Sequence, residues 1–272
     1  MFIKIKTILQ GTLVLSLSSI LMVQGVLAQG GSRADRKDDD APPANQIDQR
    51  TGETLTEAIE FLNNDQNAEA RAKLGELTLD RLSPYERSRV EQMFFSLDVQ
   101  EENYPGARQH MEAAINSGGL NDQEISQGRY QLAQLYMQEE QWAEGAKALE
   151  DWLKTAATPN GGVYYLLAAA YYNLDNFDAA LPHARKAVEM TETPQEGWLQ
   201  MLSALLLQKE QYKDALPVIQ RQVNMFPTKK VYWTQLSSVH AQLEDMSSAL
   251  VIMQMAYHAG LLSEGSEYQR LA

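Results

Sequence analysis

The chain has 272 residues, a formal net charge of -13 from 36 acidic and 23 basic side chains, and no cysteine. The absence of cysteine excludes disulfide bonds and thiolate metal sites, and the acidic balance argues against a nucleic-acid partner. The acidic residues are spread along the chain instead of forming one block, which indicates a solvated outer surface and not a cation site.

The N-terminal segment, residues 1–28, has the pattern of a secretory signal peptide. Lys4 and Lys6 precede a long uncharged apolar run, and Val26 and Ala28 stand where a signal peptidase reads small residues. We therefore expect a secreted, periplasmic protein with no stable membrane insertion after cleavage. The alternative is an uncleaved membrane anchor, although the apolar run is short for one.

The next segment, residues 29–50, is rich in Gly, Asp, Pro and Arg and offers almost nothing to bury. Such a composition predicts a flexible tether and not a domain. The remainder, residues 51–272, is predicted to be helical and repetitive.

Similar short motifs recur through this region, for example NFDAALPHA from Asn176 and QYKDALPVI from Gln211. Aligning them places unit starts near residues 51, 88, 126, 161, 196, 230 and 265. The interval is close to the 34-residue period of tetratricopeptide repeats, so the chain resembles that family. Each unit in the family is a pair of antiparallel helices.

The unit that begins at Gly161 carries the pattern most clearly. Tyr164, Leu167, Ala168 and Tyr171 follow the spacing i, i+3, i+4, i+7, so they share one helical face that must be buried. A lone helix pair cannot cover both of its faces, and stacked neighbours make a continuous core. The predicted fold is all-α: a right-handed, superhelical solenoid of tetratricopeptide type, with about six antiparallel helix pairs and the start of a seventh.

The end of the sequence does not look like a capping helix. The segment after Gly260 begins a seventh unit in phase, with Tyr268, Leu271 and Ala272 as its first stripe residues. A buried stripe would be left uncovered. Either the sequence is truncated, or this C-terminal face docks on a partner or on another copy of the chain.

The sequence contains no motif that is typical of an enzyme active site. A nucleophile elbow, a zinc-protease helix motif, a phosphate-binding loop and a dinucleotide fingerprint are all absent. The four histidines do not have the spacing of metal ligands, and His240 is expected to be a packed, hydrogen-bonded histidine. We therefore expect no enzymatic activity, no cofactor and no metal. The alternative is that these repeats are an accessory region of a longer enzyme.

The resemblance implies a concave groove lined by the first helix of each pair. Its lining, at positions that alternate with the buried stripe, has no lysine or arginine, unlike family members that clamp a C-terminal carboxylate. An apolar helix or an extended peptide with amide hydrogen bonds suits such a lining. The alternative is that some of these tyrosines simply pack against neighbouring helices. The predicted protein-binding residues are Tyr130, Gln134, Met137, Tyr165, Tyr172, Asn173, Gln200, Leu207, Gln208, Thr234, Ser238 and Gln242.

A narrower resemblance covers roughly residues 82–272. It is carried by LSPYERSRV, ENYPGA, YQLAQLYMQEEQW, QVNMFPTKKVYWTQLSSV and AYHAGLL, in that order. The chain is similar in these motifs to secreted bacterial tetratricopeptide proteins encoded beside TonB, ExbB and ExbD. The resemblance implies a periplasmic adaptor whose partners are TonB, ExbB, ExbD or a TonB-dependent receptor. The alternative is an envelope assembly factor of the same fold that acts on outer-membrane or cell-wall proteins.

Overall fold

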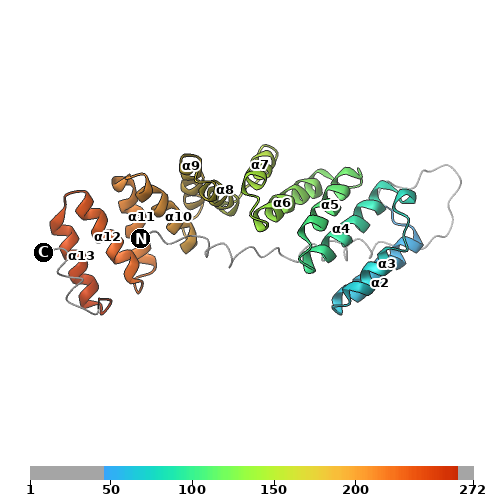
Figure 1. Ribbon diagram of the computed structural model, residues 1–272, viewed down its shortest axis with the longest axis horizontal. Coiled ribbons are helices and arrows are strands. Elements are labelled where there is room, and N and C mark those ends of the chain that lie inside the picture. The colour runs from blue at the N-terminus through green and yellow to red at the C-terminus, as the bar shows by residue number, and fades with distance from the viewer. Residues whose placement is uncertain (1–45, 263–272) are drawn as a thin grey trace. The chain divides into compact units, whose positions relative to one another are not determined.

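The computed structural model describes residues 46–262, and in this range the chain forms twelve α-helices, one short 3-10 turn and no strand. The chain divides between Ala156 and Ala157 into two compact units, which we call unit 1 and unit 2. Each unit is a series of antiparallel helix pairs (Figure 1). The predicted all-α fold of tetratricopeptide type is confirmed. None of the described helices has the length and apolar character that crossing a membrane requires.

Three predicted segments lie wholly or partly outside the described residues. The signal peptide at residues 1–28 and the seventh unit near residue 265 fall outside them, and the tether at residues 29–50 is described only from residue 46. The last residues of this tether belong to unit 1, because Ile47 packs on its apolar core and Asp48 caps its first helix. The folded part therefore begins earlier than the predicted boundary at residue 51.

Unit 1 contains three helix pairs and one 3-10 turn. The first helix of each pair contacts the second, and the turn η3 precedes the second pair. The elements are α2 (Gln49–Asn63), α3 (Asn67–Leu74), η3 (Leu79–Arg81), α4 (Pro84–Gln100), α5 (Tyr104–Asn116), α6 (Asp122–Gln138) and α7 (Trp142–Leu153).

Two capping boxes decide where α4 and α6 begin. The hydroxyl of Ser83 accepts from the backbone N–H of Glu86, whose carboxylate accepts from the backbone N–H of Ser83. Asn121 and Glu124 make the same reciprocal pair before α6. Each box satisfies backbone donors that a bare helix start leaves unpaired. These helices therefore begin at residues 84 and 122, four residues before the unit starts predicted from the repeat.

Helix α4 is unusual because four of its charged side chains are buried: Glu86, Arg89, Glu91 and Asp98. Each has a partner on another part of unit 1, as buried charges require. Glu86 accepts from the backbone N–H of Asp48 at 2.8 Å. Arg89 donates to a carboxylate oxygen of Glu124 at 2.6 Å, so these two contacts join α4 to the starts of α2 and α6.

The other two buried acids of α4 meet the flanking second helices. Asp98 accepts from Arg71 of α3 at 2.7 Å and from the side-chain amide of Asn103 at 3.0 Å. The Nδ1 atom of His110, on α5, lies 2.7 Å from a carboxylate oxygen of Glu91. We call Arg71, Glu91, Asp98 and His110 the ionic network of unit 1.

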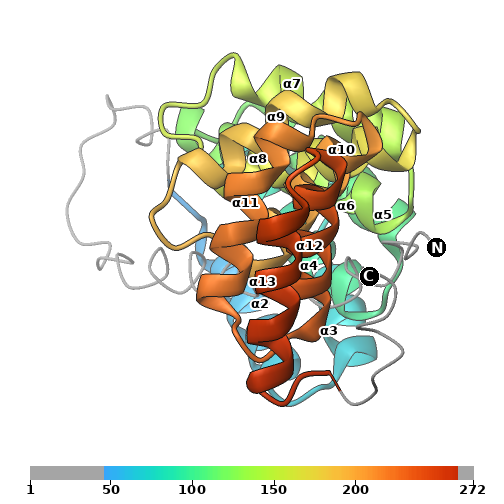
Figure 2. The same cartoon turned by 90° about the vertical axis from the view of Figure 1, so that its left-hand side faces the viewer.

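Unit 2 contains three further helix pairs, and Figure 2 shows α11, α12 and α13 side by side at its end, in agreement with their contacts. Its first helices begin at residues 161, 196 and 230, as the repeat predicted. The elements are α8 (Gly161–Asn173), α9 (Phe177–Glu189), α10 (Glu196–Gln208), α11 (Tyr212–Met225), α12 (Lys230–Gln242) and α13 (Met246–His258).

Small residues lie where the helices of unit 2 approach each other closely. Ala180 and Ala215 are fully buried. Pro182 and Pro217 lie inside α9 and α11, which begin five residues before them. A proline has no backbone N–H, so each of them removes one hydrogen bond from its helix.

Every helix pair turns through one acidic residue with a positive φ of 56° to 62°. This left-handed conformation is favourable for glycine and, less so, for asparagine. The six acids repeat with the interval of the predicted units, and all six are exposed. They are Asp65, Glu102, Glu140, Asp175, Glu210 and Glu244.

Candidate functional site

The predicted protein-binding residues all lie on first helices. Tyr130, Gln134 and Met137 are on α6 of unit 1, and the other nine are on α8, α10 and α12 of unit 2. The set is therefore divided between the two units, and only the larger part, in unit 2, brings several helices together.

Two predicted residues are buried and cannot take part in a groove. Met137 is 2% exposed, and its thioether fills the space beside Gly145, where a Cβ atom would come within 2.9 Å of the sulfur. Tyr165 is 9% exposed because its ring stacks on Trp198, with ring centroids 6.1 Å apart. Burial also raises the pKa of Tyr165. Each of these two residues packs against a partner on the neighbouring helix and has little surface left for a partner protein.

The remaining tyrosines are half-buried and also pack on aromatic neighbours. The ring of Tyr130 lies 5.1 Å from that of Trp152, and burial raises the pKa of Tyr130. The ring of Tyr172 lies 5.4 Å from that of Phe177. Such offset and tilted pairs stabilise helix packing. Each of these tyrosines therefore offers only part of its ring to a partner, as the packing alternative expected.

Gln200 belongs to a polar network that joins α10 to α12. Its amide donates to the hydroxyl of Tyr232 at 2.6 Å, and that hydroxyl donates to the carboxylate of Glu196. Lys229 reaches both oxygens of the same carboxylate at 2.6 Å. Burial alone would raise the pKa of Glu196, but the bonds from Lys229 and Tyr232 outweigh it and lower that pKa. The pKa of Tyr232 is raised by burial and by its bond to Glu196. The network positions α12 against α10, and sequence reasoning missed it because its partners lie over thirty residues apart.

The other predicted residues differ in their exposure to solvent. Asn173 donates to the backbone carbonyl of Ala169 at 2.8 Å, and Thr234 donates to that of Val231 at 2.9 Å. Gln134 and Leu207 are half-buried, whereas Gln208, Ser238 and Gln242 are exposed. The exposed and half-buried predicted residues of unit 2 all lie on first helices, and none of them is charged.

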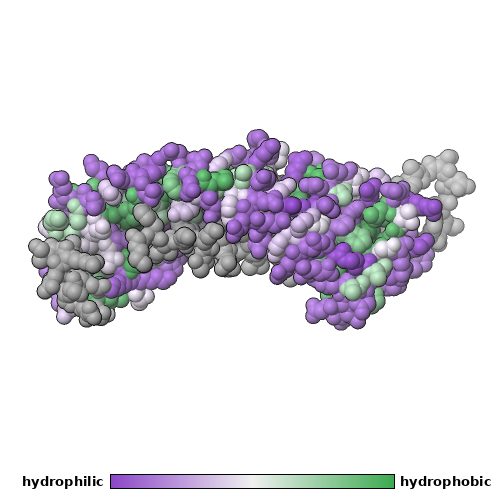
Figure 3. All heavy atoms as spheres, in the orientation of Figure 1, coloured by the Kyte–Doolittle hydropathy of each residue, from purple (hydrophilic) through white to green (hydrophobic). Residues whose placement is uncertain are grey.

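Asn173 and Thr234 bond back to their own helices. We call the five predicted residues of unit 2 that are left, Tyr172, Leu207, Gln208, Ser238 and Gln242, the uncharged face. It combines apolar and amide side chains without a lysine, arginine or carboxylate. The view in Figure 3 is mostly hydrophilic, with apolar residues in small separate areas. A surface of this composition can bind a partner through limited apolar contact and hydrogen bonds.

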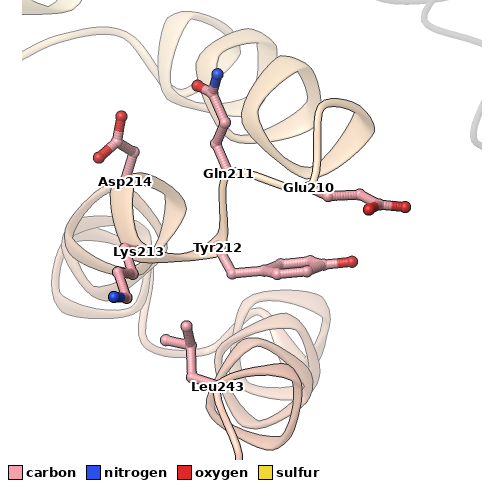
Figure 4. Close-up of a pocket in the computed structure, with 6 residues that line it drawn as sticks. All are labelled: Glu210, Gln211, Tyr212, Lys213, Asp214 and Leu243. Carbon is pink, nitrogen blue, oxygen red and sulfur yellow. The ribbon is translucent and has the colours of Figure 1, made fainter.

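The described residues offer little for other chemistry. They include no cluster of three or more potential metal ligands. A hollow of about 370 Å³ lies at the turn between α10 and α11, and Figure 4 shows that its side chains point in different directions. Because Glu210, Lys213 and Asp214 do not converge, they cannot hold one reacting atom between them.

Comparisons with known proteins support the fold and point to a family. A family model described as ChAPs (Chs5p-Arf1p-binding proteins) matches residues 63–256. No curated protein matches the chain.

Three solved structures are similar at low identity. A tetratricopeptide repeat protein from Parabacteroides merdae has a TM-score of 0.55 at 11% identity, over 78% of this chain and 80% of that one. The MamA protein has a TM-score of 0.52 at 13% identity, over 63% of this chain and 90% of that one. PilF of Pseudomonas aeruginosa has a TM-score of 0.50 at 12% identity, over 82% of this chain and 96% of that one. At these identities the likeness shows a shared fold.

Proposed function

The chain belongs to the ChAPs family, the Chs5p-Arf1p-binding proteins, and on that premise we propose that it is a non-catalytic scaffold that binds other proteins. The family description names two bound proteins, and the repeat fold presents several helices side by side. These properties support binding as the function.

The observation that carries the proposal is the uncharged face of unit 2. Leu207 and Tyr172 supply apolar contact, and Gln208 and Gln242 supply exposed amides beside it. An apolar helix or an extended segment of a partner can bury the apolar side chains and form hydrogen bonds with the amides. A face without cations is a poor site for a C-terminal carboxylate, which needs charge-assisted bonds.

We place this binding in the periplasm, at the TonB-type transport machinery. Two features of the sequence support the location: the signal-peptide pattern at residues 1–28, and the resemblance over residues 82–272 to proteins encoded beside TonB, ExbB and ExbD. The proposed partners are TonB, ExbB, ExbD or a TonB-dependent receptor.

The test is site-specific photocrosslinking of the full chain in bacterial cells. A photoreactive phenylalanine replaces Leu207 in one variant and Met225 in the matched control, since Met225 ends the second helix α11 and is 36% exposed. Products formed at residue 207 and not at residue 225 are identified by mass spectrometry. TonB, ExbB, ExbD or a receptor in these products supports the proposal.

Two outcomes contradict it in different ways. Outer-membrane or cell-wall assembly proteins at residue 207 would show an envelope assembly factor instead. Products at residue 225 alone would show that the uncharged face does not bind. The confirming substitution is Tyr172→Ala with Leu207→Ala, since replacing the buried Tyr165 would disturb packing against Trp198.

A further inference from the structure

All six first helices end on a carboxamide side chain. This position falls at the same place in every repeat, in unit 1 as well as in unit 2. The residues are Asn63, Gln100, Gln138, Asn173, Gln208 and Gln242. We call them the carboxamide row, and within each unit it has three members.

Local structure does not account for this row. Only Asn173 bonds back to its own helix, through the carbonyl of Ala169. Among the described residues, the other five side chains have no hydrogen-bond partner, and Asn63, Gln138, Gln208 and Gln242 are exposed. A helix C-terminus is better stabilised by a cation, yet no first helix has a lysine or arginine in its last turn. The carboxamides are therefore free to bind something else.

A carboxamide presents a donor and an acceptor side by side, which complements the N–H and C=O groups of a peptide main chain. In unit 2, the first helices α8 and α10 are in contact, and packed helices have axes roughly 8–10 Å apart. A polyproline II segment repeats its orientation every three residues, or about 9.3 Å, and leaves its main-chain groups unbonded. Such a segment can therefore present its main-chain groups to successive members of the row.

The acids beside the row indicate which side chains the bound segment should carry. Two residues after each carboxamide stands the acid with positive φ, and none of these six acids forms an ion pair with a described residue. A carboxylate there is unfavourable for the backbone conformation and for the negative end of the helix dipole. Lysine or arginine side chains on the bound segment would neutralise this edge.

We propose that the carboxamide row binds the main chain of an extended, basic segment of polyproline II type. The inference rests on the proposed scaffold function and adds the chemistry of the partner. The segment would contribute carbonyl and N–H groups to the row and cationic side chains to the acids of the helix turns.

The test measures binding of labelled twelve-residue peptides to the full chain by fluorescence anisotropy. The probe is (Lys-Pro-Thr)4, and the comparisons are (Glu-Pro-Thr)4 and (Lys-Gly-Thr)4, which lack the charge or the polyproline II preference. We expect the probe to bind at least fivefold more tightly than either. The double variant Gln208→Ala/Gln242→Ala should weaken probe binding at least fivefold, since one hydrogen bond contributes roughly that factor. The matched control is Gln220→Ala, on the exposed side of the second helix α11.

A second pair of variants separates charge from main-chain binding. Glu210→Gln/Glu244→Gln should weaken the probe and flatten its salt dependence, whereas the exposed control Glu189→Gln should not. Equal binding of the lysine and glutamate peptides, or an unchanged affinity in the carboxamide variant, would overturn the inference. If the affinity is unchanged in the carboxamide variant and crosslinks at residue 207 also persist in it, the proposed scaffold function stands. Only the proposed role of the carboxamide row is then rejected.

Discussion

Helix α4 of unit 1 and helix α10 of unit 2 occupy the same place in their repeats but are stabilised in different ways. Glu91 and Asp98 stand in α4 where α10 has Leu199 and Leu206, and all four side chains are at most 3% exposed. Among the described residues of unit 2, no charged side chain is buried. The same helix-pair geometry thus accepts either carboxylates with polar partners or leucines at its core positions, provided that each buried charge has its partner.

The largest expected effect breaks the network of unit 1. Asp98→Ala should lower the free energy of unfolding of unit 1 by about 3 kcal/mol, because Arg71 and Asn103 lose an acceptor at a buried site. Leu206→Ala in α10 should lower the free energy of unfolding of unit 2 by about 2–5 kcal/mol, because it leaves a cavity in the core. Hydrogen exchange with mass spectrometry, in increasing urea, follows each unit separately.

The decisive control replaces the whole ionic network with apolar side chains. The quadruple variant Arg71→Met, Glu91→Leu, Asp98→Leu and His110→Leu removes all four members together. Their further partners, Arg87, Glu101 and Asn103, are half-buried or exposed. Replacing a complete buried network in this way is often neutral or stabilising. If this variant were as unstable as Asp98→Ala, the contrast with α10 would reflect side-chain shape and not unpaired charge.

The next effect concerns a feature that the two units share. Ala107 in α5 and Ala180 in α9 are both fully buried at the close approach of a helix pair. Leucine at either position should overpack the interface and lower the free energy of unfolding by about 1–3 kcal/mol. Chemical denaturation of the single variants checks this, with serine as the small control. A tolerated leucine in one unit alone would show that its helices can separate.

How far the sequence predicts this fold can be seen at the helix starts. The repeat alone locates α8, α10 and α12, because unit 2 keeps the regular apolar stripe. It misses the starts of α4 and α6, although the S-x-x-E spacing of Ser83 and Glu86 is a capping-box signal in the sequence. Local cap chemistry, and not the repeat, decides those boundaries.

The sequence could not predict which residues of the candidate site are accessible, for a physical reason. Repeat register identifies first helices and their faces, but burial of one residue depends on its neighbour across the pair. Met137 is buried because Gly145 leaves room for it, and Tyr165 because Trp198 lies against its ring. The partner of Glu91, His110, could not be predicted either, since nothing in the local pattern around α4 indicates it.

A smaller effect tests the turns that both units have in common. Glu102→Gly in unit 1 and Glu210→Gly in unit 2 should each stabilise the protein by about 0.5–1 kcal/mol, because glycine adopts a positive φ without steric strain. Thermal unfolding measures the gain. The matched control is Glu112→Gly inside α5, an exposed position, which should destabilise by a similar amount. A gain in only one unit would mean that the acids of the other unit have a favourable partner.

The smallest expected effect compares two aspartates that cap helices in different units. Hydrogen bonds from Ser248 and then Ser247 hold the pKa of Asp245 well below its ordinary value of 3.8. For Asp48, burial alone would raise the pKa, but the bond from the backbone of Thr51 and the contact with Glu86 outweigh it and lower that pKa. A lowered pKa in the folded state contributes stability above the unfolded value, and this is lost as pH falls through the folded value.

Protection of the first turns of α13 and α2 should therefore be constant above about pH 5 and decline below about pH 4. Hydrogen exchange at these two helix starts, corrected for the intrinsic rate at each pH, measures the decline. Asp245→Asn and Asp48→Asn keep a capping oxygen but cannot titrate, so each should flatten the profile of its own helix and leave the other unchanged. A decline that persisted in Asp245→Asn would assign the acid sensitivity of unit 2 to another carboxylate, with Glu196 the first to replace because its pKa is also lowered.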